Sequence, residues 1–155
     1  MDIRIRRARP DDASPLSDIA IRSKRSNGYD DAFMAACVGE LTVTPEKLAE
    51  SEYWVAEAET LCGCACLGTE ADGRAGEVSF FFIDPAWQRR GVGRLLWDKL
   101  LERARTQGFQ TLRLDADPAA VPFYEAMGFR VVGQAPSGSI RGRTLPHMLL
   151  DILDN

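Results

Sequence analysis

The chain has 155 residues, which suits one domain with a sizeable core, and we expect that domain to span residues 1–155. Its formal net charge of −4 argues against a protein that binds nucleic acid through its overall charge. No apolar stretch approaches the ~20 residues that span a bilayer, and the charged N-terminus is unlike a signal peptide. We therefore expect a cytoplasmic protein without a nucleic-acid or membrane partner.

The N-terminal half of the chain contains signals for both strands and helices. Ile3 and Ile5 alternate with arginines, which is typical of a half-buried strand. Thr44 followed by Pro45 predicts a helix start, because threonine caps free N–H groups and proline fits the first helical position. The expected elements are, in order, a strand at 3–5, a helix that begins near residue 10, a loop over 23–31, helices over 33–41 and from 45, and strands over 53–58 and 61–67.

The chain has four cysteines, Cys37, Cys62, Cys64 and Cys66, of which the last three alternate. Alternate residues of a strand share one face, so we expect these three side chains to point together into the core. Metal sites usually need Cys-x-x-Cys spacing and further ligands, and the chain has a single histidine, His147. We therefore expect small buried side chains in a reducing cytosol, and no metal.

The C-terminal half predicts a strand, a long helix and three further strands. The long helix would bury Val92, Leu95, Leu96, Leu100 and Ala104, and it would end before Gly108. The expected elements are a strand over 77–83, the helix from about 92, a strand over 112–115, a short helix that ends at 127–128, and strands over 130–134 and 147–152 with a long glycine-rich loop over 136–146 between them. This mixture predicts an α/β or α+β fold around a mixed sheet.

The most informative segment is the glycine loop over 88–94, between the apolar strand and the long helix. Backbone N–H groups at the start of a helix lack partners, and the helix dipole makes this end positive, so the loop suits a phosphate group. An NTPase phosphate loop is excluded because Gly-x-x-x-x-Gly-Lys-Ser/Thr does not occur, and a dinucleotide loop is disfavoured because Leu96 replaces its third glycine. An ordinary glycine turn remains an alternative on this loop alone.

Two segments together resemble the GNAT (GCN5-related) N-acetyltransferase family. Residues 88–93, Gln-Arg-Arg-Gly-Val-Gly, match its Gln/Arg-x-x-Gly-x-Gly/Ala loop. Residues 117–129 resemble its Asn-x-x-Ala-x-x-Phe-Tyr-x-x-x-Gly-Phe element, with Asp117 where asparagine is common. The resemblance implies a bent mixed sheet of about seven strands flanked by about four helices. It also implies that the pantetheine of coenzyme A lies between two splayed central strands.

The resemblance further implies acetyl-CoA as the cosubstrate and suggests roles for single residues. Tyr124 would donate a proton to the leaving thiolate, and Glu77 would accept a proton from the acceptor amine, directly or through water. The alternatives are that Tyr124 is a core aromatic residue and that Glu77 is a solvated strand end. The residues expected to bind the cofactor are Phe81, Phe82, Ile83, Gln88, Arg89, Arg90, Gly91, Val92, Gly93, Arg94, Asp117 and Phe123.

The expected activity is transfer of the acetyl group to the primary amine of a small molecule or a peptide. We expect this acceptor to bind near Tyr29, Asp115, Arg141 and Arg143. No His/Ser/Asp or Cys/His pair stands at suggestive spacing, so direct attack by the amine is favoured over an acyl-enzyme. The alternative from another class is a non-catalytic acyl-CoA-binding sensor or regulatory module. A homodimer is compatible with both the enzyme and the non-catalytic module.

Overall fold

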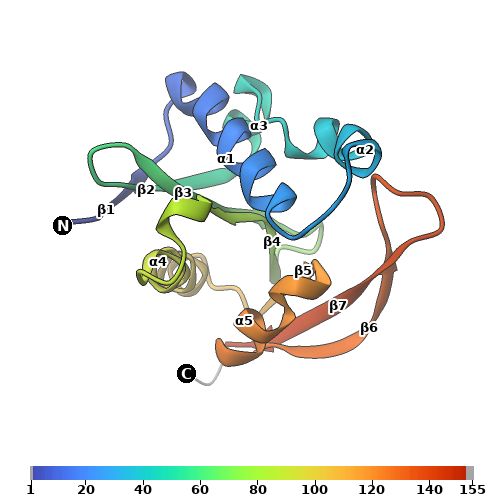
Figure 1. Ribbon diagram of the computed structural model, residues 1–155. Helices are drawn as coiled ribbons and strands as arrows, with labels where there is room; N and C mark the ends of the chain where they lie inside the picture. The colour runs from blue at the N-terminus through green and yellow to red at the C-terminus, as the bar shows by residue number, and fades with distance from the viewer. Residues whose placement is uncertain (1, 153–155) are drawn as a thin grey trace.

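The strands form one mixed sheet of seven strands in the order β1-β2-β3-β4-β5-β7-β6. The structure is a computed structural model that describes residues 2–152. Helices α1, α2 and α3 cover one face of the sheet, and α4 and α5 cover the other (Figure 1). The elements are β1 (Arg4–Arg7), α1 (Ala13–Arg25), α2 (Asp31–Leu41), α3 (Pro45–Glu50), β2 (Glu52–Glu57), β3 (Leu61–Thr69), β4 (Ala75–Ile83), α4 (Val92–Thr106), β5 (Thr111–Asp115), α5 (Val121–Ala126), β6 (Arg130–Pro136) and β7 (Thr144–Asp151).

This architecture confirms the expected fold class, with five α-helices where about four were expected. Three short 3-10 turns, Pro10–Asp12, Pro85–Trp87 and Pro118–Ala120, lead into α1, the glycine loop and α5. No helix within residues 2–152 has both the length and the apolar character needed to cross a membrane.

The two central strands β4 and β5 are the only parallel neighbours in the sheet of the described chain. They pair over just three positions, the last of which joins Glu77 to Arg113. Beyond this point β4 continues to Ile83 beside β3, whereas β5 continues to Asp115 beside β7. The strands therefore diverge, which is the splayed arrangement that the sequence resemblance implies.

Each face of the sheet has its own apolar core. On the face of α4, the helix buries Val92, Leu96, Trp97, Leu100 and Ala104 against the sheet. The expectation that Leu95 belongs to this stripe is wrong, since it is 40% exposed. Trp97 takes its place and packs edge-on against Phe129, with ring centroids 5.3 Å apart.

Two expected loops are shorter than the sequence suggested. Helix α1 continues to Arg25, and its last turn carries Arg22, Lys24 and Arg25, which interact favourably with the negative end of the helix dipole. Strands β6 and β7 extend toward each other until Pro136 pairs with Thr144, so the loop expected over 136–146 shrinks to residues 137–143. The pairing of the two strands in the hairpin therefore extends β6 and β7 into a glycine-rich stretch in which apolar and polar residues do not alternate.

All four cysteines are free and buried, but the three of β3 do not share one face. Cys62 belongs to the core on the α4 side, whereas Cys64 and Cys66 belong to the core on the α1 side. The expectation fails because a register shift between Ala56 and Glu57 places an extra β3 residue at Cys62, and one extra residue reverses the facing of a strand. Burial raises the pKa of the Cys64 and Cys66 thiols. Residues 2–152 contain no group of three or more His, Cys, Asp or Glu side chains that could hold a metal ion.

Candidate active site

A cavity of about 770 Å³ opens where β4 and β5 diverge. One end lies against the glycine loop and the start of α4, and the other lies between α2 and the β6–β7 hairpin. The segments that line it are residues 77–83, 87–89, 91–94, 115–117, 119–120 and 123–124, with Ser23, Lys24, Asn27, Glu40, Leu41, Pro136, Gly138 and Leu145 at its rim. The cavity therefore joins the expected phosphate site to the expected acceptor site.

The glycine loop presents backbone N–H groups at one end of this cavity. Gly91 is the N-cap of α4 with φ +82°, and no side chain caps the helix. Arg89 also has a positive φ, +65°, and left-handed residues in such loops turn successive N–H groups toward one concave side that suits an anion. A Cβ on Gly93 would lie 3.1 Å from the Phe123 ring, so glycine there lets the ring approach the helix start. The first turn of α4 is thus open to a phosphate.

An aromatic group surrounds Tyr124 in the middle of the cavity wall. The Tyr124 ring makes edge-on contacts with Phe81, Phe123 and Phe129, with centroids 5.4–6.0 Å apart. Only 7% of the residue is exposed, yet its hydroxyl has no hydrogen-bond partner among the described residues and reaches the cavity. Burial raises the pKa of Tyr124, so the phenol stays protonated at neutral pH and can donate a proton.

Three titratable side chains, on β4, β5 and β7, lie near the divergence. Glu77 is the last β4 residue that pairs with β5, and Asp115 ends β5. Asp115 Oδ1 lies 2.7 Å from Nδ1 of His147, its register partner on β7. Burial raises the pKa of Glu77, and the negative charges of Glu70 and Asp115 add to this effect, whereas His147 opposes it. The shift moves Glu77 toward the range in which a carboxylate is an effective general base.

Asp117 sits at the centre of a polar cluster that joins four parts of the chain. Its Oδ2 accepts hydrogen bonds from Lys24 Nζ at 3.0 Å and from Tyr29 Oη at 2.8 Å, and its Oδ1 accepts one from the Ala119 N–H at 2.9 Å. Arg143 Nη2 donates to Tyr29 Oη at 2.8 Å. Burial alone would raise the pKa of Asp117, but these donors hold it below its usual value. We call Lys24, Tyr29, Asp117 and Arg143 the Asp117 cluster.

Most residues predicted for the site line the cavity together. Both expected catalytic residues, Tyr124 and Glu77, are on its wall, as are Asp115 and all of the expected cofactor residues except Arg90. The Arg90 guanidinium instead lies over the Trp87 ring, 5.1 Å from its centroid. Of the expected acceptor residues, Tyr29 and Arg143 are bound within the Asp117 cluster, and Arg141 is exposed and off the wall.

Sequence reasoning missed several residues of this site. Trp87 lines the cavity beside the glycine loop, Lys24 lines it next to Asp117, and Glu40 lines its far end. His147 was noted only as the single histidine, although its pairing with Asp115 places it next to the wall. No local signal shows that His147 lies opposite Asp115, because this depends on the antiparallel register of β5 and β7. No local signal marks Glu40, which depends on the docking of α2 against the β6–β7 hairpin.

The chain matches known acetyltransferases in sequence and in fold. The family model for the acetyltransferase (GNAT) domain matches residues 29–148. A peptidyl-lysine N-acetyltransferase, YjaB of Salmonella typhimurium, is 30% identical over 156 aligned positions that cover 99% of each chain. The crystal structure of the PaiA N-acetyltransferase of Thermoplasma acidophilum in complex with coenzyme A has a TM-score of 0.80, 20% identity, and coverage of 98% of this chain and 100% of that chain.

Other curated relatives share only part of their length with this chain. The S18-alanine N-acetyltransferase of Salmonella typhimurium is 42% identical over 50 residues, which are 30% of this chain and 34% of the relative. The chain spans 34–49% of the length of three such relatives. Two of them are named for different acceptors, the alanine of ribosomal protein bS18 and glucosamine 6-phosphate. The family model covers more than half of the chain, and the YjaB relative aligns over nearly its whole length. The chain belongs to the GNAT family of acetyltransferases.

Proposed function

We propose that the protein transfers the acetyl group of acetyl-CoA to a primary amine by direct attack. The observation that carries the proposal is the unpartnered hydroxyl of the largely buried Tyr124, which reaches a cavity that begins at an uncapped helix start. A phosphate site and a proton donor in one cavity suit a ligand with a pyrophosphate at one end and a thioester at the other. The family membership and the full-length likeness to an N-acetyltransferase support this assignment.

The glycine loop would hold the pyrophosphate of the cosubstrate. The N–H groups at the start of α4 would bind phosphate oxygens, and Arg89 and Arg94 at the cavity wall would add positive charge. The pantetheine would then run along Phe81 and Phe123 toward Tyr124. Asp117 has little free acceptor capacity for the cofactor, because its two oxygens already accept from three donors.

The reaction itself needs one bond to form and one to break. The amine nitrogen attacks the thioester carbonyl carbon, the carbon–sulfur bond breaks, and the sulfur leaves as a thiolate. Tyr124 donates its proton to that thiolate, and the amine proton passes to Glu77 through a water molecule. Beyond Glu77, β4 has no partner strand on its β5 side, so a backbone N–H of the segment 82–83 is free to hold the oxyanion.

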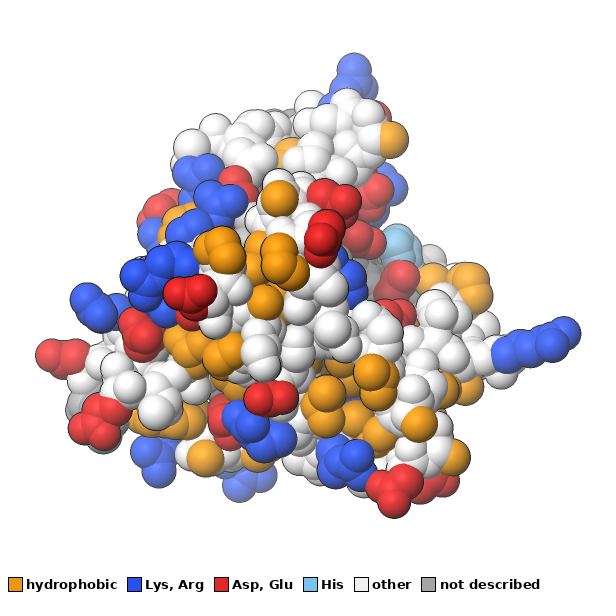
Figure 2. All heavy atoms as spheres, turned by 90° about the horizontal axis from the view of Figure 1, so that it is seen from above, with side chains coloured by type: hydrophobic (Ala, Val, Ile, Leu, Met, Phe, Trp, Pro, Cys, Tyr) orange, Lys and Arg blue, Asp and Glu red, His pale blue; other side chains and the backbone are white. Residues whose placement is uncertain are grey.

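We extend the proposal to the setting of the enzyme. A continuous sheet from β1 to β7 supports residues 1–155 as one acetyltransferase domain. Four buried free cysteines fit a reducing compartment such as the cytoplasm. Lysine, arginine and acidic side chains are interspersed over the face of α1, α2 and α3 (Figure 2), which fits a partner other than nucleic acid. Edge strand β6 exposes Val131 and Val132, which would suit a homodimer contact.

The first prediction concerns the glycine loop. Gly91→Asp and Gly91→Asn have similar size, and both residues tolerate a positive φ better than most, so they differ mainly in charge. We expect Gly91→Asp to bind coenzyme A about tenfold more weakly than Gly91→Asn, because a carboxylate would stand beside the pyrophosphate. Titration calorimetry on the two folded variants measures the difference. Equal affinities would place the pyrophosphate elsewhere.

The second prediction concerns Tyr124. Tyr124→Phe removes only the hydroxyl, and we expect turnover to fall by about 10²–10⁴ with little change in the affinity for acetyl-CoA. Tyr53→Phe is the matched control, because Tyr53 is also 7% exposed but lies in the other core, off the cavity wall. Steady-state kinetics on both variants decide the matter. A Tyr124→Phe enzyme that keeps wild-type turnover would remove Tyr124 from the mechanism.

The third prediction concerns Glu77, whose pKa is raised mainly by burial. A base works only when deprotonated, so wild-type turnover should fall as the pH drops through this raised pKa. Glu77→Gln removes the base, and we expect turnover about 10²-fold lower at neutral pH that recovers as the pH rises and more amine is neutral.

The control for Glu77 is Glu70→Gln, which removes a neighbouring charge that raises the Glu77 pKa. It should shift the acid limb of the rate profile to lower pH without loss of maximal turnover. A Glu77→Gln enzyme with the wild-type pH–rate profile would mean that Glu77 is a solvated strand end.

A further inference from the structure

We propose that the acceptor is a small diamine, a molecule that carries a second ammonium group beyond the amine that is acetylated. This inference rests on the proposed function and specifies its substrate class. Its basis is the distribution of charge along the cavity. Three carboxylates, those of Glu40, Glu77 and Asp115, line the end away from the glycine loop, whereas Arg89 and Arg94 line the end beside it.

Among the described residues, the carboxylates at the acceptor end have no lysine or arginine ion-pair partner, and Asp115 contacts the His147 ring. Among the described residues, Glu40 accepts a hydrogen bond from the neutral Ser139 hydroxyl at 2.7 Å, and Glu77 forms no ion pair. Arg113 lies opposite Glu77 in the strand register, but the two side chains form no ion pair among the described residues. The negative charge at this end is thus available to a ligand.

The two cations of the Asp117 cluster are already engaged. Lys24 pairs with Asp117 at 3.0 Å, and Arg143 donates to Tyr29 and lies 4.0 Å from Asp117. They therefore offer little to an acidic acceptor, which corrects the idea that Arg143 meets an anionic group of the substrate. An acceptor with a carboxylate near its far end would instead face Glu40 and Asp115, and like charges at close range are unfavourable.

Tyr124 marks where the reacting atoms lie between the two charged ends. Its hydroxyl is unpartnered, 93% of the residue being buried, and it faces the cavity that the carboxylates line. The nitrogen that attacks near Tyr124 must be neutral, so three carboxylates would not stabilise it by charge attraction. A second nitrogen that stays protonated throughout the reaction would gain from Glu40 and Asp115, while Glu77 remains the base for the first.

The acceptor end is also closed over in a way that suits a small molecule. The β6–β7 loop is tied to α2 by the Ser139–Glu40 hydrogen bond, and Arg143 of the same loop is tied to Tyr29 of the α1–α2 loop within the Asp117 cluster. Gly138 lies so close to the Glu40 carboxylate that a Cβ there would be 2.6 Å from Oε1. We infer that these contacts narrow the acceptor end, which favours a short aliphatic chain with two amines over a polypeptide.

The experiment compares three acceptors of equal chain length with saturating acetyl-CoA: 1,5-diaminopentane, pentylamine and 5-aminopentanoate. We expect kcat/KM for the diamine to exceed that for pentylamine by about tenfold, and pentylamine to exceed the amino acid. A lysine peptide with a neighbouring arginine is the fourth arm. A higher kcat/KM for that peptide than for the diamine would overturn the assignment to a small acceptor.

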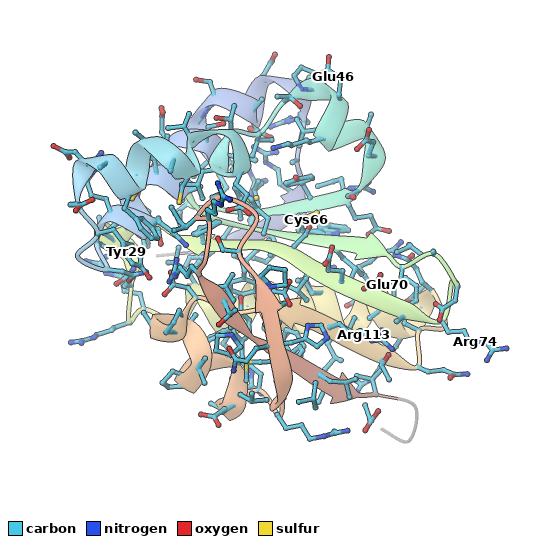
Figure 3. All side chains as sticks on the ribbon, turned by 90° about the vertical axis from the view of Figure 1, so that its right-hand side faces the viewer. Tyr29, Glu46, Cys66, Glu70, Arg74 and Arg113 are labelled. Atoms are coloured by element: carbon cyan, nitrogen blue, oxygen red, sulfur yellow. The ribbon has the colours of Figure 1, made fainter. Side chains whose placement is uncertain are left out.

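Two variants test whether Glu40 and Asp115 cause the preference for the diamine over pentylamine. Glu40→Gln and Asp115→Asn should each raise KM for the diamine about tenfold and leave the KM for pentylamine far less affected, so that the preference collapses. Glu46→Gln is the control, because Glu46 is an exposed residue of α3 on the outer side of the helices (Figure 3). It should keep the diamine preference intact.

The failure of this inference differs from the failure of the proposed function. Equal kcat/KM for diamine and pentylamine, or a preference that survives both carboxylate variants, would overturn the diamine assignment while acetyl transfer stands. Binding of acetyl-CoA without thiol release for any of the four acceptors would overturn the proposed function as well.

Discussion

The divergence of β4 and β5 is the constraint on which the rest of the molecule depends. Two parallel strands that separate after three paired positions leave backbone groups without partners and a gap in the sheet. Unpaired backbone groups inside a protein are costly unless a ligand or water binds them. The gap is maintained because α4 and α5 pack on one side and the Asp117 cluster bridges the other, so the cavity is held open by the fold around it.

The Asp117 cluster shows how one substitution within a family pattern changes the use of a position. An asparagine at this point would be neutral, whereas Asp117 attracts Lys24 and, through Tyr29, Arg143. Tyr29 stacks on Phe33 with ring centroids 3.9 Å apart, and both Lys24 and Arg143 lie within 6 Å of these rings. The cluster therefore joins α1, the α1–α2 loop, the segment after β5 and the β6–β7 loop, and it engages two cations, Lys24 and Arg143, that an acidic acceptor would need.

The sequence predicted the sheet, the order of elements and the position of the glycine loop between β4 and α4 well, because these features follow from local patterns. Strand alternation, the Thr44 cap and the glycines of the loop over 88–93 are all signals within a few residues. The wrong predictions concern residues whose position depends on contacts between segments far apart in the sequence. The bulge at Cys62 turned one cysteine to the other face, and Arg143 found an intramolecular partner that no spacing could show.

The acceptor end of the site was the least predictable part for the same physical reason. Glu40 and His147 stand about a hundred residues apart in the chain and reach the site only through helix docking and strand register. Their electrostatic effect on a ligand depends on where they lie relative to Glu77 and Asp115, which are on two further strands. Patterns within a few residues of sequence do not show which charges from distant segments come together at one end of the cavity.

The most direct measurement is the release of free thiol from acetyl-CoA with and without an amine, together with mass spectrometry of the acceptor. We expect thiol release that depends on the amine and equals the amount of acetylated amine formed. Tight binding of acetyl-CoA without amine-dependent thiol release, across small amines and lysine peptides, would contradict the assignment as an enzyme and would favour a non-catalytic acyl-CoA-binding module.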